Sequence, residues 1–475
     1  MVGPDFKSPS PPKVARFTQQ PLTKHIAETP AVGKAGARQT FVFKESLRDD
    51  WWTLFHSKEL NFLIHKGLAN SPTLKAAYAA LRQTQEIYNT QLGNTMFPSV
   101  DAVVSGQRQR ALAPIGLTGG TNVYNLFNAT LNVGYTLDLF GGLRRQLEAL
   151  RSQIHYQEYL LIGAYLSLTS NIALTSITIA SLEAQIRAKK ELIHFQLDQL
   201  KTLRKQYELG AISNAIVFSQ TSLVEQNRAT LPILEKNLSR SEHALSVLVG
   251  ESPDKHLPHI KLDNLVLPKH LPVTLPSELV RQRPDIRASE ELLHAASAQI
   301  GVAKAQFFPQ VVLTGYDGWQ ATVASTLFTP AQKVWNMAAT VTQPVFHAGA
   351  IFSNWRAAVA AFEQAHEVYQ DTVLKAFQNV ADVLRAIETD AQALQAEMRA
   401  EIAAKKFLRL AKTQYDLGAT SYLVLLEAQQ QYQSVYLLRI VAQAARYSDT
   451  VALYQALGGA WWKRQWCATK VCKGV

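Results

Sequence analysis

Two stretches of the chain alternate between apolar and polar residues, which is the pattern of a β-strand with one apolar face. The clearer stretch covers 127–139, where apolar residues alternate with Asn, Thr, Gly and Asp. A less strict copy covers 335–342. Each is the second of a pair of strand-like runs, and turns rich in Gly, Pro and Thr connect the pairs at about 111–124 and 318–332. The pattern predicts four strands of about ten to thirteen residues.

Helical segments surround each pair of strands. A helix of about thirty residues precedes each pair, at 58–96 and 276–306, and ends at a Phe-Pro pair because proline cannot continue the hydrogen-bond ladder. Long segments with few prolines follow the strands, at 142–209 and 349–417. As helices they would each be roughly 100 Å long, at a rise of about 1.5 Å per residue.

Both long helices are expected to end at a Tyr-x-Leu-Gly motif. Its glycine, Gly210 or Gly418, can adopt the left-handed conformation of a helix C-cap. A second helix then returns in each half, over about 215–249 and 421–458. Each half of the chain therefore ends in a helical hairpin.

Landmarks recur in the same order in the two halves, which indicates a tandem duplication. The corresponding segments are Ser71-Pro72 and Arg283-Pro284, Phe97-Pro98 and Phe308-Pro309, and 206–211 and 414–419. Their offsets are 212, 211 and 208 residues. The expected segments are an extended N-terminal strap (1–50), a first repeat (51–250), a linker (251–275), a second repeat (276–458) and a C-terminal tail (459–475).

Composition changes this picture little. The 475 residues include 48 Lys and Arg against 37 Asp and Glu, a net charge of +11. The basic residues are scattered through helical segments, so solvated helix faces are favoured over nucleic-acid binding. Cys467 and Cys472 have poor spacing for zinc, and a small disulfide or a free pair are both consistent with them.

One segment, 159–182, is uncharged and long enough to cross a bilayer. Ser, Thr and Asn recur through it, so a helix packed in a bundle is favoured over a helix that spans lipid. The chain starts with MVGPDF, which has neither the basic start nor the apolar run of a secretory signal.

The strands have the length needed to cross an outer membrane at a tilt, with lipid on the apolar face and water on the polar face. Four strands cannot close a barrel, and open edges are not tolerated in lipid, so several subunits must combine. Three subunits would supply twelve strands. A soluble sandwich sheet has the same alternation, but it has no use for two helices of roughly 100 Å.

Several motifs resemble those of outer-membrane efflux proteins, a TolC-like family, in its NodT-type lipoprotein branch. The most specific motif is LPSELVRQRPDI at 275–286, continuing to Gly301 and Pro309. The starting VGPDF, LDLFG at 137–141 and LYQALGG at 453–459 also match. The resemblance covers nearly the whole chain.

The resemblance implies an α+β membrane protein, a homotrimer in which the duplicated subunit gives four strands of a 12-stranded transmembrane β-barrel. A long periplasmic α-helical barrel would continue the tube. The implied partners are a periplasmic adaptor protein, an inner-membrane pump and outer-membrane lipid, with no nucleic acid. The implied function is a passive exit duct for drugs or other small export substrates, without a cofactor or a catalysed reaction.

Members of this branch begin at a lipidated cysteine just before a start like VGPDF. The resemblance therefore predicts an acylated cysteine immediately N-terminal to Met1 in the native protein. It also predicts a lipid-anchored location in the outer membrane, with the chain extending into the periplasm.

By resemblance, the two helix-turn-helix tips form the periplasmic mouth and contact the adaptor. The tips include Tyr207, Gly210 and Ser213 in the first hairpin, and Tyr415, Gly418 and Ser421 in the second.

Leu423 and Glu427 align with positions that narrow the pore in this family, by an apolar ring and an acidic ring. An acidic ring repeated by symmetry would attract cations and raise the carboxyl pKa values. Thr420 stands where the family often has a second acid, so closure would depend more on Leu423 and Glu427. The alternative is a core leucine and a solvated helix glutamate.

No set of catalytic residues is evident. The twelve histidines are dispersed, and no zincin helix, phosphate-binding loop or nucleophile elbow occurs. The sequence predicts that the protein is not an enzyme and has no metal site. Two other functions stay open, a channel for protein or metal export and a soluble coiled-coil scaffold whose strands cap the helices.

Overall fold

The computed structural model describes residues 1–461 apart from 13, 15, 24, 44–46 and 113–120. Cys467 and Cys472 lie outside the described residues. The chain forms two compact units, each with segments from both repeats. Unit 1 contains Met1–Pro9, Ala79–Glu158 and Ala288–Gln370, and unit 2 contains Ser10–Tyr78, Tyr159–Arg287 and Asp371–Val475.

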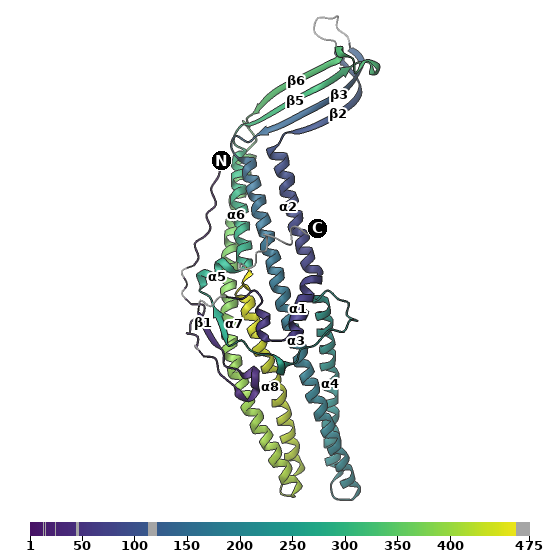
Figure 1. Ribbon diagram of the computed structural model, residues 1–475, viewed down its shortest axis with the longest axis vertical. Helices are drawn as coiled ribbons and strands as arrows, with labels where there is room; N and C mark the ends of the chain where they lie inside the picture. Colours follow the sequence, from purple (N-terminus) through teal and green to yellow (C-terminus); the bar gives the residue numbers. More distant parts are fainter. Residues whose placement is uncertain (13, 15, 24, 44–46, 113–120, 462–475) are drawn as a thin grey trace. The chain divides into compact units, whose positions relative to one another are not determined.

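Unit 1 contains a four-stranded antiparallel sheet in the order β2-β3-β5-β6 (Figure 1). The strands are β2 Ser99–Leu112, β3 Thr121–Leu137, β5 Gln310–Ala321 and β6 Lys333–Thr342. They contain 14, 17, 12 and 10 residues, so β2 and β3 are longer than predicted. Among the described residues, β2 and β6 each have a strand on one side only.

The strand register gives this sheet one apolar and one polar face. Val133 lies opposite Val100 and Gly315, and Gly315 lies opposite Met337, so the four share a face. The same face carries Ala102, Val104, Ala129, Leu131, Tyr135, Leu313, Trp319, Trp335 and Ala339. The other face carries Ser99, Ser105, Asn128, Asn132, Thr136, Thr314, Asn336 and Thr340. The predicted alternation is thus confirmed along the described strand residues 127–137 and 335–342, while charged residues such as Asp317 and Lys333 join the apolar face elsewhere in the sheet.

Two long helices follow the strand pairs, as predicted. They are α3 (Gly142–Glu208) and α7 (Ala350–Asp416), each of 67 residues. At about 1.5 Å per residue each is roughly 100 Å long. They return as α4 (Asn214–Leu248) and α8 (Tyr422–Ala456), each of 35 residues. Among the described helices, α3 alone is apolar and long enough to cross a membrane, and just over half of its most apolar stretch is buried in the protein.

The single helices expected at 58–96 and 276–306 are each broken into two, so this prediction was wrong. The observed helices are α1 Lys58–Asn70 and α2 Pro72–Met96, and α5 Pro276–Gln282 and α6 Pro284–Ala305. Ser71 and Arg283 precede the prolines and have ψ angles of 121° and 128°. A residue before proline is driven out of the helical region by the proline ring, which explains both breaks.

The strap and the linker pair with each other, which the sequence did not predict. Strand β1 (Thr40–Phe43) lies parallel to β4 (His270–Val273). Arg446 of α8 is 2% exposed and donates to the carbonyl of Ala35 (2.9 Å) and to Oε1 of Gln39 (2.9 Å). The N-terminal strap is therefore fixed to α8 by a buried guanidinium.

Asp390 of α7 and Asp449 of α8 form a hydrogen-bonded carboxyl pair. Burial, and then the charge of Asp390 and its hydrogen bond, raise the pKa of Asp449 to about 7, from an ordinary value of 3.8. An acid with a raised pKa in the folded state favours folding while it is protonated. Its contribution is present below pH 3.8 and is lost as the pH rises through 7.

We expect Asp449→Asn to stabilise the protein at pH 8, by roughly 2 kcal/mol, and to change its stability little near pH 4. The amide removes the charge that the fold disfavours at high pH. Thermal melting followed by circular dichroism at both pH values measures this. Asp382→Asn, on the exposed side of α7, is the control and should change neither melting temperature. An equal shift of the Asp449→Asn protein at both pH values would contradict the assignment.

Candidate gate and docking tips

The long helix of each hairpin ends in the same type of turn. Gly210 N–H donates to the carbonyl of Tyr207 (2.8 Å), and Ala211 N–H donates to that of Gln206 (2.8 Å). These are the two bonds of a Schellman C-cap. In the second hairpin the equivalent bonds, of 2.9 and 2.8 Å, close the turn at Gly418. The glycine φ angles of +73° and +70° confirm the predicted left-handed C-caps.

The return helices start differently after these similar turns. Ser213 caps α4, because its hydroxyl accepts a hydrogen bond from Ala215 N–H (3.3 Å). Ser421 occupies the same position before α8 with an extended backbone, and its side chain makes no capping hydrogen bond. Ser421 is exposed, so its hydroxyl is available to another molecule.

Both tips leave apolar side chains uncovered. Leu209 is 83% exposed and Leu417, its counterpart in the second repeat, is 78% exposed. Tyr207 is 45% exposed, and no atom of the described residues lies within 4 Å of the place where Gly210 or Gly418 would carry a Cβ. The sequence analysis did not name these two leucines as candidates. They occupy the third position of the Tyr-x-Leu-Gly motif, so their recurrence in a predicted turn could have identified them.

A shared core joins the two hairpins behind the tips. Tyr422 of α8 is 5% exposed, and its hydroxyl donates to Oε1 of the fully buried Gln220 of α4. Tyr415 packs edge-on against Tyr422, with 5.6 Å between ring centroids. Burial raises the pKa of Tyr422, and Tyr415 adds to the effect. The same core contains Leu203, Leu223, Ala411, Leu425, Leu426 and Ala428.

Leu423 and Glu427 lie one helical turn apart on an outward face of α8, and Thr420 is half-buried just before that helix. Leu423 is 69% exposed, while Leu425 and Leu426 occupy the core positions. The alternative interpretation of Leu423 as a core leucine is therefore wrong for this chain. Its role in a pore stays a prediction.

The two hairpins differ at the two predicted gate positions. At the 208-residue offset, Ala215 corresponds to Leu423 and Ser219 corresponds to Glu427. The first hairpin thus has a small side chain and a hydroxyl where the second has a bulky apolar group and an acid. The second hairpin therefore has the bulkier and the charged side chain at these two positions.

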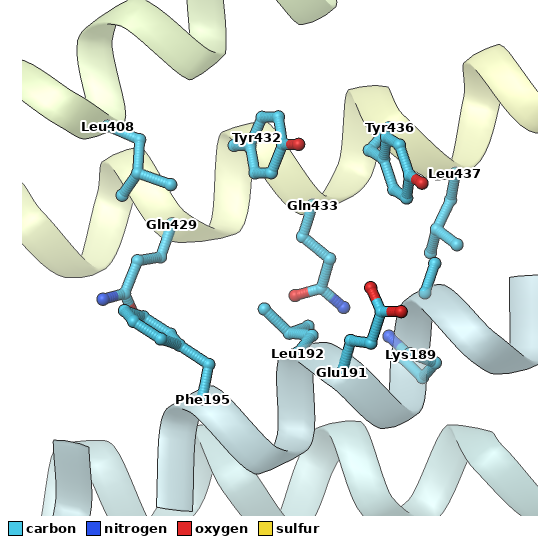
Figure 2. Close-up of a pocket in the computed structure, with 11 residues that line it drawn as sticks. Lys189, Glu191, Leu192, Phe195, Leu408, Gln429, Tyr432, Gln433, Tyr436 and Leu437 are labelled. Carbon is cyan, nitrogen blue, oxygen red and sulfur yellow. The ribbon is translucent and has the colours of Figure 1, made fainter. Parts of the chain in front are cut away.

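The described residues contain no group of three or more His, Cys, Asp or Glu side chains that could hold a metal ion. A cavity of about 300 Å³ lies between α3 and α8, with Leu408 of α7 also in its wall (Figure 2). Its lining is mainly apolar and aromatic, with Lys189, Glu191, Gln429 and Gln433 as the polar members.

Comparison with known proteins gives a consistent result. The chain matches the family model of outer membrane efflux proteins over residues 63–251 and 275–459. It is similar to the probable efflux pump outer membrane protein TtgC of Pseudomonas putida, with 29% identity over 463 residues, 97% of this chain and 93% of that protein. The pyoverdine export outer membrane protein OpmQ of Pseudomonas aeruginosa is 28% identical over 417 residues, 86% of this chain and 87% of that protein.

Solved structures of channels also resemble the fold. The outer-membrane channel OprN has a TM-score of 0.85 and 26% identity, covering 97% of this chain and 99% of that chain. The open state of the Neisseria gonorrhoeae MtrE outer membrane channel has a TM-score of 0.80 and 26% identity, covering 97% of this chain and 98% of that chain.

We expect Tyr422→Phe to destabilise the packing between the two hairpins by about 1–3 kcal/mol, because Gln220 Oε1 then stays buried without a donor. A lower melting temperature of the purified protein measures the loss. Tyr207→Phe removes a hydroxyl from an exposed tyrosine and should leave the melting temperature unchanged. Equal melting temperatures for wild type and Tyr422→Phe would show that the bond contributes nothing.

Proposed function

Because the chain belongs to the outer membrane efflux protein family, we propose how its own residues gate and dock the channel that this family forms. The protein is an outer-membrane channel subunit of an efflux system. A soluble coiled-coil scaffold, the alternative of a different class, is therefore excluded. The observation that carries the membrane assignment is the uncovered apolar face of the sheet, where Val104 is 80% and Met337 83% exposed.

The channels that share this fold are trimers with a long helical barrel and a β domain. Edge strands β2 and β6 are the surfaces on which three copies of this chain would close a barrel. Pairing β6 of one subunit with β2 of the next would satisfy the edge N–H and C=O groups that lipid cannot solvate. Twelve strands then enclose the polar face, which carries Asn, Ser and Thr side chains.

The gate is formed by Leu423 and Glu427, one pair from each subunit. Their exposure on one face of α8 supports this, because neither side chain is used by the core of its own chain. Three leucines would make an apolar constriction that excludes water and ions. Three glutamates one turn further would favour cations over anions at the same constriction. Thr420 adds no charge there.

The tips dock a periplasmic adaptor protein, which links the channel to an inner-membrane pump. Leu209 and Leu417 support this assignment, since two exposed leucines at equivalent turns offer an apolar contact pair to a helical partner. Tyr207, Gly210, Ser213, Tyr415, Gly418 and Ser421 surround these leucines along the two turns. The open space at both glycines lets a partner's backbone approach closely.

The exported substrates are small organic compounds. The names of the similar proteins support this, because they refer to antibiotic, toluene, solvent and pyoverdine export. The channel itself supplies a path rather than a reaction, and the pump selects the substrate. A role in protein or metal export is the alternative that a transport assay with these compounds would test.

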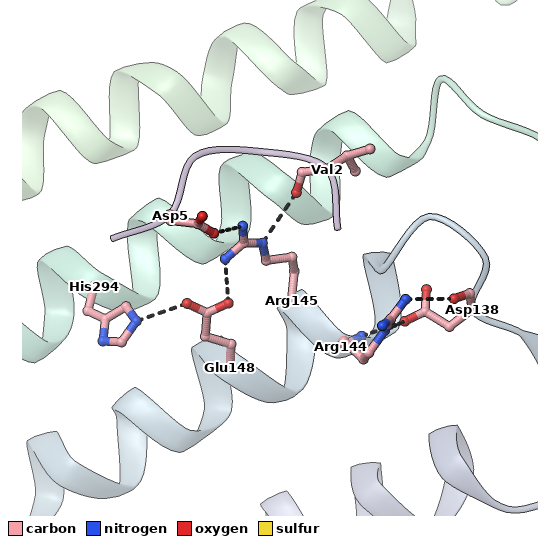
Figure 3. Close-up of polar contacts among 7 residues, drawn as sticks. All are labelled: Val2, Asp5, Asp138, Arg144, Arg145, Glu148 and His294. Atoms are coloured by element: carbon pink, nitrogen blue, oxygen red, sulfur yellow. Dashed lines mark hydrogen bonds and ion pairs between the residues drawn. The ribbon is translucent and has the colours of Figure 1, made fainter. Parts of the chain in front are cut away.

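An acylated cysteine immediately before Met1 stays a prediction. The first residues lie on unit 1, where Arg145 of α3 binds the Asp5 carboxylate (2.6 Å) and the carbonyl of Val2 (3.2 Å), as Figure 3 shows. The same guanidinium binds Glu148 (2.7 Å), which also contacts His294 (3.0 Å). This clasp would hold a lipid-bearing end beside the strand-bearing unit. Mass spectrometry of the native protein that found an unmodified N-terminus would contradict the prediction.

We expect Leu423→Ala and Glu427→Ala each to raise single-channel conductance in a planar bilayer by about twofold or more, since each widens the constriction. The control is Leu438→Ala, a leucine of α8 that is 50% exposed and lies outside the proposed gate. Its conductance should equal that of wild type. Unchanged conductance in both variants would contradict the assignment of Leu423 and Glu427 as the gate.

We expect the double variant Leu209→Ser, Leu417→Ser to bind its purified adaptor at least about tenfold more weakly. The variant lacks the two leucine side chains that the adaptor would bury on binding. Binding is measured by interferometry on the trimer in nanodiscs. The trimer and its conductance should be preserved, which separates docking from gating. Leu410→Ser, at a leucine of α7 that is 56% exposed, is the matched control. Adaptor binding at wild-type strength would refute the docking role of the tips.

A further inference from the structure

Among the residues that the structure describes, Lys189 of α3 is a buried cation without an acidic partner. Only 6% of the residue is exposed. Its ammonium donates to Oδ1 of Asn227 on α4, at 2.9 Å. Within the described part of the chain, no carboxylate lies within 4.0 Å of this ammonium, and burial lowers the pKa of Lys189. A buried charge is costly unless it is paired, so this ammonium has unused capacity to bind an anion.

The neighbouring amides do not use up that capacity. Asn227 Oδ1 also accepts from Gln433 Nε2 (2.8 Å), so two donors share one acceptor. Asn227 Nδ2 donates to Gln196 Oε1 (2.8 Å). An ammonium has three N–H donors, and one of those on Lys189 is accounted for. The amide network therefore fixes the position of the lysine head without neutralising it.

The cavity between α3 and α8 lies directly at this lysine (Figure 2). Leu192, Phe195, Leu408 and Leu437 make apolar walls, and the rings of Tyr432 and Tyr436 stack at 5.8 Å beside them. Gln429, which is 2% exposed, also lines the cavity, and its Oε1 atom is buried without a hydrogen-bond partner. The volume of about 300 Å³ is at the lower end of the range for small-molecule sites.

We propose that this cavity binds a small amphiphilic carboxylate, with its anionic head on Lys189 and a flat apolar body between Phe195 and the two tyrosines. The exposed acid Glu191 is part of the lining, so a second negative charge on the ligand would be repelled. The site therefore selects monoanions over dianions. Gln429 Oε1 would accept a hydrogen bond from a hydroxyl or amine on the same ligand.

The site would connect the two hairpins. Lys189 and Phe195 belong to α3, whereas Tyr432 and Tyr436 belong to α8. A ligand held by both helices adds its binding free energy to their packing. Ligand binding should therefore raise the melting temperature of the protein in proportion to the logarithm of ligand concentration above the Kd.

The test uses 2-naphthoate as the probe and 2-naphthalenemethanol as its neutral analogue. Binding to the full-length trimer in nanodiscs is followed by saturation-transfer NMR and by the shift in melting temperature. We expect naphthoate to bind and to raise the melting temperature, and the neutral analogue to bind at least about tenfold more weakly, because it lacks the charge that Lys189 pairs with.

Matched variants locate the site. Lys189→Met should weaken naphthoate binding at least about tenfold, and it should fold, because it replaces a buried charge by an apolar chain of similar length. Lys190→Met makes the same charge change at a lysine whose side chain is 57% exposed and paired with Glu235, and it should bind as wild type does. Leu192→Trp should fill the cavity and abolish binding.

Three results would overturn the proposal. One is the absence of naphthoate binding to wild type, which would mean that the buried ammonium is solvated by water alone. Another is equal binding of naphthoate and the neutral analogue. The third is wild-type binding in Lys189→Met or in Leu192→Trp, which would place the probe elsewhere in the protein. None of these results bears on the proposed gate or docking tips, whose residues lie outside the cavity lining.

Discussion

The two unpaired edges of the four-stranded sheet are the constraint on which the rest of this structure depends. Lipid offers no hydrogen bonds, so the N–H and C=O groups along β2 and β6 must find partners on other subunits before the sheet can lie in a membrane. The apolar face adds a second requirement, since side chains such as Val104 and Met337 are uncovered in the single chain. Closure by identical copies meets the first requirement, and lipid around the closed barrel meets the second. It also repeats every residue of the chain around one axis, so a single leucine or glutamate becomes a ring.

The duplication and its later divergence explain which residues can act in such rings. Both hairpins keep the Schellman turn and its exposed leucine, Leu209 or Leu417, so the tips are equivalent surfaces. In contrast, Leu423 and Glu427 stand where the first hairpin has Ala215 and Ser219. The two hairpins thus have similar turns but different side chains just beyond them. In the proposed function, the turns serve docking and the differing side chains serve closure. In the proposed trimer an adaptor would contact six similar tips, while the proposed constriction would come from three of the twelve long or returning helices.

Much of the fold follows from sequence patterns because these patterns record a local cause. The period of two in β3 reflects a sheet with two different surroundings, and the left-handed turns require Gly210 and Gly418. The breaks before Pro72 and Pro284 also have a local cause. The prediction of single helices was wrong because it did not apply the effect of proline on the preceding residue.

Other features had no local signal in the sequence. The pairing of β1 with β4 joins two four-residue strands about 230 positions apart, and neither strand has enough residues to show a period. The sequence could not show that Leu423 points outward while Leu425 and Leu426 point into the core. The three leucines lie within one helix turn and differ only in the direction in which each side chain points. The burial of Lys189 likewise depends on Asn227 and Gln433, which belong to other helices.

Beside the apolar core that joins the two hairpins, α8 and α4 also make buried polar contacts. Gln433 and Tyr422 of α8 bind Asn227 and Gln220 of α4, and Lys189 of α3 binds the same Asn227 within the first hairpin. Buried polar groups add little net stability, since each hydrogen bond replaces one to water, but they penalise any packing that leaves them unpaired. An apolar seam would tolerate many sliding arrangements of α3, α4 and α8 at similar free energy. A polar seam favours one register of these helices. Any other register leaves buried polar groups unpaired, so no continuous series of arrangements has similar free energy. For the gate proposed above, in which α8 carries Leu423 and Glu427, a definite register of α8 would give the closed arrangement a definite geometry without requiring it to be very stable.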